Sequence, residues 1–147
     1  MLTLRHYRKS DFVPLMHVLY PNENYADVER PAIEWARKEY NGKAFEMFTI
    51  CLENEPIGKV TLYQHTESIV SVWPEIAPAF RHRGFGSAAM KLMIEIARKK
   101  GYKTVMQQIE VGNEASEDLH TRLGFQTSGI VYKKPKEGKF RIYLLSL

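Results

Sequence analysis

The stretch from Phe80 to Gly101, FRHRGFGSAAMKLMIEIARKKG, limits the fold more than any other part of the sequence. Gly84 and Gly86 follow a strand-like run and precede a pattern in which apolar residues recur every three or four positions. Gly101 suits the C-terminal cap of a helix with that period. The stretch therefore predicts a tight strand-to-helix turn and an amphipathic helix, from about residue 84 to 100, that packs on a sheet.

Strand-like and helical runs alternate along the rest of the chain. The predicted strands span 2–7, 45–54, 57–65, 68–77, 103–111, 125–134 and 139–147, and the other helices span 9–20, 27–40 and 113–124. Short links favour an antiparallel meander of the three middle strands, and the turn-rich PKEG favours a closing hairpin. The order β-α-α-β-β-β-α-β-α-β-β predicts an α/β (mixed α+β) fold, with a mixed sheet of about seven strands and about four helices on its faces.

The composition fits a single domain over residues 1–147, because 44% hydrophobic residues supply enough apolar surface to offset the entropy of ordering the chain. The one cysteine, Cys51, excludes an internal disulfide and a cysteine-based metal site, and its apolar neighbours predict burial. No stretch approaches the roughly 18 apolar residues of a membrane span, and the N-terminus lacks a signal-like apolar core. We therefore expect a cytoplasmic protein without a membrane partner.

The formal net charge of +4 favours an anionic ligand without identifying one. A nucleic-acid-binding domain is one interpretation, but the basic residues are interspersed with acidic ones and no recognition motif occurs, so we expect no nucleic-acid partner. His6, His17 and His65 have no ligand spacing, and a metal site is not expected.

The glycine turn has more than one interpretation when it is taken alone. Unpaired N–H groups at a helix start, with Arg81 and Arg83 beside them, suit a pyrophosphate. The same glycines and arginines also suit the plain start of a surface helix. A third interpretation uses Gly84, Gly86 and Ala89 as the G-x-G-x-x-A fingerprint of a dinucleotide fold, with Glu110 as its acidic residue. That fold needs further parallel strands and crossover helices, whereas the flanking pattern here predicts hairpins.

The segment from Arg81 to Gly86, RHRGFG, resembles the acetyl-CoA signature Gln/Arg-x-x-Gly-x-Gly/Ala of the GNAT N-acetyltransferase superfamily. Downstream, NEASEDLHTRLGF resembles the N-x-x-A-x-x-L-Y-x-x-x-G-F segment of the same family. The matching residues are Asn113, Leu119, Gly124 and Phe125, with Ser116 at the usual alanine and His120 at the usual tyrosine. The order and separation of the two segments are those of the family, and the predicted elements cover nearly the whole chain.

The resemblance implies a binding site for acetyl-CoA as cosubstrate. Backbone N–H groups from about Arg83 to Ser87 would bind the pyrophosphate, and the strand that ends near Ile76 and Ala77 would pair with the pantetheine arm and help to polarise the thioester carbonyl. The next strand would diverge and leave a slot for that arm. The cofactor-binding residues implied are Ile76, Ala77, Arg81, His82, Arg83, Gly84, Phe85, Gly86, Ser87, Asn113 and Ser116.

The implied activity is direct transfer of an acetyl group to a primary amine. A lysine-like amine has a pKa of about 10.4, so a base must remove its proton before it attacks. Glu75, in WPEIAP, is the candidate base, and its alternative role is a strand carboxylate that orients the substrate. The strand backbone could supply an N–H to the oxyanion. His120 could protonate the leaving thiolate, or it fills space while water or another tyrosine does so.

The acceptor itself is not identified by the sequence. A small-molecule amine and a peptide or protein amine both stay open, and YPNENY, residues 20–25, is a candidate acceptor loop or an ordinary polar loop. Because the usual tyrosine is missing, a noncatalytic coenzyme A-binding module is the main alternative function. Homodimers are common among proteins of this resemblance, and the sequence leaves the oligomeric state open.

Overall fold

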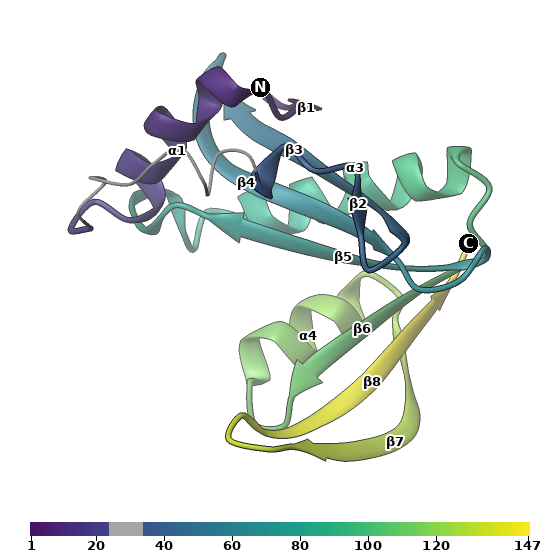
Figure 1. Ribbon diagram of the computed structural model, residues 1–147. Helices are drawn as coiled ribbons and strands as arrows, with labels where there is room; N and C mark the ends of the chain where they lie inside the picture. Colours follow the sequence, from purple (N-terminus) through teal and green to yellow (C-terminus); the bar gives the residue numbers. More distant parts are fainter. Residues whose placement is uncertain (24–33) are drawn as a thin grey trace.

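The computed structural model describes residues 1–23 and 34–147 (Figure 1). Its strands are β1 (Leu2–His6), β2 (Glu39–Tyr40), β3 (Lys43–Leu52), β4 (Glu55–Gln64), β5 (Ile69–Ile76), β6 (Thr104–Glu110), β7 (Gln126–Lys134) and β8 (Gly138–Ser146). Its α-helices in that part of the chain are α1 (Phe12–Leu19), α3 (Phe85–Lys99) and α4 (Glu114–Arg122). Two single turns of 3-10 helix occur at Lys9–Asp11 and Pro78–Phe80.

The strands form one mixed sheet in the order β1-β3-β4-β5-β6-β8-β7, with β2 paired to β3 outside that path. The β5–β6 pair is parallel, and each of the other neighbouring pairs is antiparallel. The predicted mixed sheet, the meander and the closing hairpin are therefore confirmed. A single parallel pair, with antiparallel neighbours on both sides, also confirms that the chain is not a dinucleotide fold.

The predicted helix over 27–40 is only partly testable, because residues 24–33 lie outside the described part of the chain. Its C-terminal end is wrong: Glu39 and Tyr40 form β2 and pair with the start of β3. Asn41 and Gly42 have positive φ angles of 52° and 73°, the backbone of a tight hairpin turn. Asn-Gly is a strong hairpin signal in sequence, and it overrides the helical pattern before it.

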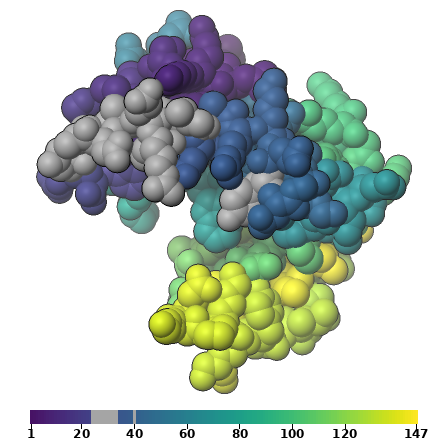
Figure 2. All heavy atoms as spheres, viewed as in Figure 1, coloured from purple at the N-terminus to yellow at the C-terminus, as the bar shows by residue number. Residues whose placement is uncertain are grey.

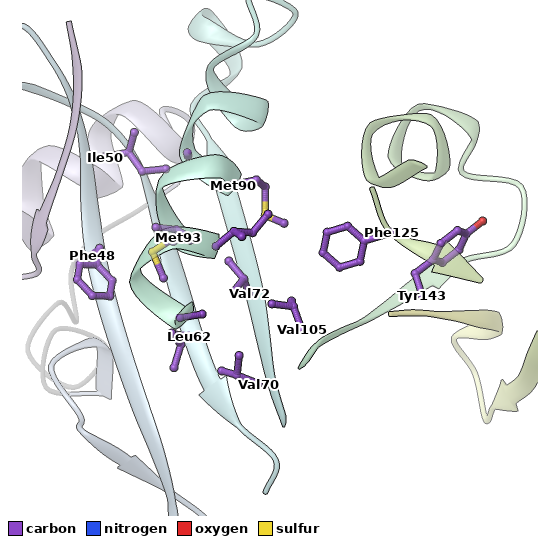
Figure 3. Packing of buried hydrophobic residues seen from close by; sticks show 14 of the residues in the cluster. Phe48, Ile50, Leu62, Val70, Val72, Met90, Met93, Val105, Phe125 and Tyr143 are labelled. Carbon is purple, nitrogen blue, oxygen red and sulfur yellow. The ribbon is translucent and has the colours of Figure 1, made fainter. Parts of the chain in front are cut away.

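Helix α3 covers one face of the sheet and forms most of the core with it (Figure 3). The apolar stripe predicted for this helix is confirmed as buried: Met90, Met93, Ile94 and Ala97. It packs on the inward residues of the central strands, among them Phe48, Ile50, Leu62, Val70, Val72 and Val105. Cys51 is buried as expected, with its thiol free. Apolar burial on this scale is the main force that holds the helix on the sheet.

Helix α4 begins and ends as the sequence predicts. The Asn113 side-chain oxygen accepts a hydrogen bond from the Ser116 N–H at 3.2 Å, and Gly124 follows the helix with a φ of 97°. Phe125, directly after the helix, is buried beside Tyr143 of β8 (Figure 3). The one buried residue of α4 is His120.

Candidate active site

The sheet is split where its two central strands diverge (Figure 1). β5 and β6 pair only at Ile69 with Thr104 and at Val70 with Val105, although both strands continue beyond those pairs. The divergence predicted between these strands is therefore present in the fold. It leaves the second half of β5 without a neighbour on that side.

Two residues explain why the strands separate. The side-chain amide of Gln107, on β6, takes the place of a strand at Val72: it accepts from the Val72 N–H at 2.9 Å and donates to the Val72 carbonyl at 2.6 Å. Two residues further along β5, Pro74 has no N–H with which to continue a ladder. Neither residue was singled out from the sequence, although a proline inside a strand pattern is a signal of an unpaired edge.

The open edge of β5 presents alternate residues to the gap. Because Val72 points its backbone groups toward β6, Pro74 and Ile76 point theirs in the same direction. The Ile76 carbonyl already accepts from the Arg81 Nε at 2.9 Å, and the Ala77 N–H donates away from the gap to the Ile57 carbonyl at 2.8 Å. Two groups of this edge thus have no partner among residues 1–23 and 34–147 and are available to a ligand: the Pro74 carbonyl and the Ile76 N–H.

The glycine turn lies directly after this edge. His82 and Gly84 have positive φ angles of 62° and 83°, and Gly84 is the N-cap of α3, where no side chain caps the helix. The N–H groups of Phe85, Gly86 and Ser87 have no partner among the described residues, while the Ala88 N–H returns to the Gly84 carbonyl at 3.0 Å. The helix start therefore presents open donors next to the gap.

Gly86 is not required by the fold itself. A Cβ built on Gly86 would meet only Ile76 Cγ1, at 3.9 Å, and its φ is not in the left-handed region. A glycine inside a helix costs roughly 1 kcal/mol relative to alanine, so its place here favours close approach by a ligand. Arg83 lies over the Phe80 ring, 5.7 Å from its centre, at the same turn.

The gap has two arms, which are the diverging strands β5 and β6. The β6 arm leads to the start of α4. Asn113 and Ser116, predicted to contact the cofactor, stand there, directly after β6. The Asn113 oxygen is used by the helix cap, so this side chain offers its amide N–H groups to a ligand. The fold thus brings the two predicted segments to the two arms of one gap.

Glu75 lies on the sheet face opposite α3 and has two partners. Tyr20, at the end of α1, donates its hydroxyl to Glu75 Oε1 at 2.6 Å, and Lys59 Nζ lies 3.2 Å from Oε2. Burial and the neighbouring Glu75 carboxylate raise the pKa of Tyr20, so the phenol keeps its proton. Lys59, which sequence reasoning missed, also lies over the Trp35 ring, 4.9 Å from its centre.

His120 is 6% exposed and lies behind the gap, with Gln107 between it and β5. Its Nδ1 is 2.7 Å from the Ser116 carbonyl, an acceptor, so Nδ1 carries the proton. Its Nε2 is 3.2 Å from the Gln107 amide nitrogen and accepts from it. Burial lowers the pKa of His120, and the neutral ring completes a chain of hydrogen bonds that ends at Val72.

These features agree with an independent comparison of sequences. The sequence model of the acetyltransferase (GNAT) family matches residues 5–125, most of the chain. The chain belongs to the GNAT acetyltransferase family. The match includes the glycine turn, both arms of the gap and the segment through Phe125, and it confirms the resemblance carried by the two motifs.

One curated GNAT relative is the L-methionine sulfoximine/L-methionine sulfone acetyltransferase of Pseudomonas aeruginosa, which is 45% identical over 49 residues. That match covers 33% of this chain and 28% of the relative, so the chain aligns with under a third of the relative's length.

Solved GNAT structures share the fold over nearly the full length. YncA of Salmonella typhimurium, solved with its cofactor acetyl-CoA, has a TM-score of 0.74 and 20% identity, and the match covers 100% of this chain and 94% of that one. Mutant forms of the spermidine/spermine N-acetyltransferase SpeG of Vibrio cholerae have a TM-score of 0.77 and 17% identity, and the match covers 99% of this chain and 95% of that one. At these identities the likeness establishes the fold.

Two further findings concern the described residues alone. Within 1–23 and 34–147 there is no group of three or more His, Cys, Asp or Glu residues that could hold a metal ion. In the same part of the chain no helix has the length and apolar character needed to cross a membrane.

Proposed function

We propose that this GNAT protein is an acetyl-CoA-dependent N-acetyltransferase that transfers an acetyl group directly to a primary amine. The observation that carries the proposal is the placement of an uncapped helix start, with open N–H groups at Phe85 to Ser87, beside the unpaired edge of β5. A diphosphate with an extended amide-containing arm matches both features. Location in the cytoplasm stays a prediction from the sequence.

The residues present fit coenzyme A. Its pyrophosphate would accept hydrogen bonds from the N–H groups between Arg83 and Ser87, with the α3 dipole and the charge of Arg83 adding attraction. The open space at Gly86 admits the phosphate atoms close to the backbone. A pantetheine amide would donate to the Pro74 carbonyl, as a strand would, and the Ile76 N–H would be left for the thioester carbonyl. Asn113 would contact the cofactor from the other arm.

Acetyl-CoA supplies the acetyl group as a thioester, from which the amine displaces the thiol. In this proposal Glu75 accepts the amine proton, directly or through one water, while Tyr20 and Lys59 hold its carboxylate in place. The alternative role, in which Glu75 only orients the substrate, draws support from the same two partners. Glu75→Gln separates the two roles: loss of the base lowers kcat about 100-fold or more, whereas loss of orientation mainly raises KM.

The structure leaves fewer candidate N–H donors for the oxyanion than the sequence suggested. Pro74 has no N–H and Val72 gives its own to Gln107, which leaves Ile76 as the donor on the described edge of β5.

The role of His120 as the proton donor to sulfur stays a prediction. Its hydrogen bonds show what protonation of the ring would require. The ring must gain a proton at Nε2, where it accepts from Gln107, in a buried pocket that lowers its pKa. His120→Phe would lower the chemical rate with unchanged coenzyme affinity if the ring is the acid. Full activity in that variant would assign the proton to water or to another group.

Binding of the cofactor can be tested at the helix start. Ser87→Asp adds a negative charge to the first turn of α3, where it helps the helix dipole by about 0.5 kcal/mol but repels a pyrophosphate. We expect the variant to fold with equal or higher stability and to bind coenzyme A at least about tenfold more weakly by calorimetry. Ser87→Asn is the matched control of the same shape. Equal coenzyme A affinities of the two variants would show that the pyrophosphate does not bind at the start of α3.

Transfer itself is tested by release of free thiol from acetyl-CoA with a panel of primary amines. Turnover with any amine, lost in Glu75→Gln, supports the proposed function. Tight coenzyme A binding without turnover across small amines, peptide N-termini and lysine side chains would favour the noncatalytic coenzyme A-binding module instead.

A further inference from the structure

A cavity of about 650 Å³ opens on the sheet face opposite α3. It extends from the side chains of β3 and β4 to Gln107 and Gln108 on β6, so it reaches the place where β5 and β6 diverge. Figure 2 shows the surface notched between the blue and teal part of the molecule and the yellow-green C-terminal part. The cavity thus meets the proposed cofactor slot from the side away from α3.

The walls of this cavity are largely aromatic or apolar. They include Trp35, Phe45, Met47, Tyr63 and Trp73. Trp73 is 63% exposed although it stands in the middle of a central strand of the sheet. A tryptophan held open to solvent at the edge of a cavity offers a large flat surface on which another ring can stack.

Charge in the cavity gives no advantage to a polycation. Lys59 and Arg37 line it, and Glu34 is the one carboxylate among its described lining residues. Glu75, close by, already has the ammonium of Lys59 at 3.2 Å. The Lys59–Glu75 pair is neutral and Glu34 balances Arg37, so the described residues give the cavity no excess of negative charge that would attract a ligand with several positive charges. An amine with one charge is more easily bound there in its neutral, reactive form.

Trp73 and Glu75 are separated by two positions on β5, so their side chains leave the same face of the sheet about 7 Å apart. A ring stacked on Trp73 can therefore place an amine near Glu75 if two or three single bonds join the ring to the nitrogen. Chain-like amines without a ring would leave the aromatic wall uncovered.

We propose that the acceptor is an aromatic monoamine, with a ring on Trp73 and a short alkyl link to the primary amine, rather than a polyamine. This rests on the proposed function, because the amine is taken to react beside the cofactor slot. Trp73 is then a specificity-determining residue, and the cavity is the acceptor site.

The test compares phenylethylamine, tryptamine, spermidine and ethanolamine in two assays with the full-length protein. Calorimetry in the presence of coenzyme A measures binding, and thiol release from acetyl-CoA measures turnover. We expect the two aromatic amines to bind, and their kcat/KM to exceed that of spermidine about tenfold or more, the size of one good ring contact with its buried area. Preference for spermidine, or binding of neither aromatic amine, overturns the inference.

Variants locate the effect. Trp73→Ala should raise KM for phenylethylamine about tenfold, with unchanged coenzyme A affinity and unchanged kcat/KM for ethanolamine, and Trp73→Phe should restore most of the loss. Ile130→Ala, which shortens another exposed apolar side chain, is the control and should change neither the KM for phenylethylamine nor the kcat/KM for ethanolamine. An equal effect of Trp73→Ala on phenylethylamine and ethanolamine would refute the ring contact.

The two proposals fail separately. Binding of aromatic amines without turnover of any amine overturns the proposed function and supports the acceptor site. Turnover of spermidine or ethanolamine without binding of aromatic amines overturns the acceptor site and supports the proposed function.

Discussion

Replacing Gln107 by leucine should remove the hydrogen-bonded side chain that fills the gap between β6 and Val72 of β5. The Gln107 side chain is 5% exposed and makes three polar contacts: with the Val72 N–H at 2.9 Å, the Val72 carbonyl at 2.6 Å and His120 Nε2 at 3.2 Å. Leucine has a similar volume, so the change removes the polar contacts and largely keeps the packing.

The expected loss of unfolding free energy is about 3 kcal/mol. Each buried group left without a partner costs roughly 1–3 kcal/mol, and three groups lose one, while the apolar leucine offsets part of that cost. For a chain of this length the loss lowers Tm by about 10 °C.

Urea unfolding followed by tryptophan fluorescence measures the effect, with the midpoint and the m-value fitted together. Gln126→Leu, the same change at an exposed site on β7, is the control and should stay within about 0.5 kcal/mol of the parent. A loss below about 1 kcal/mol for Gln107→Leu, with an unchanged m-value, would refute the argument that this amide replaces a strand.

Gln107→Glu sharpens the test because it keeps the shape and changes only the hydrogen bonding. A carboxylate can still accept from the Val72 N–H, but it also faces the Val72 carbonyl and the lone pair of His120. Burial and the neighbouring Val72 carbonyl raise the pKa of the introduced carboxyl in the folded state, so its share of stability is present at low pH and lost as pH rises. The difference in unfolding free energy between the variant and the parent should therefore shrink as the solution is acidified toward about pH 4.5.

Three further predictions concern stability. Asp11→Ala should lose about 3 kcal/mol, because a guanidinium, a backbone N–H and a buried hydroxyl all donate to the Asp11 carboxylate; chemical unfolding measures it, and Asp118→Ala, at an exposed acid, should change little. Gly58→Ala should lose about 3 kcal/mol by the same measurement, because the new Cβ would lie 2.3 Å from a backbone carbonyl oxygen of β5; a stable variant would contradict the close approach of the strands. Burial lowers the pKa of His120 and of His65 below the unfolded value near 6.5, so stability is complete above about pH 6.5 and falls as pH drops below it. Tm recorded against pH should show this decline, with a shallower slope in His120→Phe, and a flat curve for the parent between about pH 7 and 5 would contradict it.

Much of the fold could be predicted because its signals are local. The glycine at residue 84, the period of α3 and the Asn113 cap each depend on a few neighbouring residues. Several boundaries differ by one or two residues, and the wrong helix end at 39–40 arose where two local signals compete, of which the Asn-Gly turn is the stronger. The family resemblance also rested on short motifs, so the amino-acid sequence was sufficient to indicate it.

The site was less predictable because its parts come from distant segments. Tyr20 and Glu75 are 55 positions apart, and Gln107 reaches Val72 from 35 positions away. No pattern within one element indicates that such side chains meet. The cavity proposed as the acceptor site likewise uses residues from β3, β4, β5 and β6.

The sequence by itself determined most of the elements, the glycine turn before α3 and the family resemblance, because backbone geometry, capping and hydrophobic period act over a few residues. Only the tertiary structure decided that β8 lies between β6 and β7, that Pro74 and Gln107 hold the sheet open, and that His120 is buried and neutral. The physical reason is that pairing, burial and proton affinity depend on which segments meet in space, and that choice minimises the free energy of the whole chain.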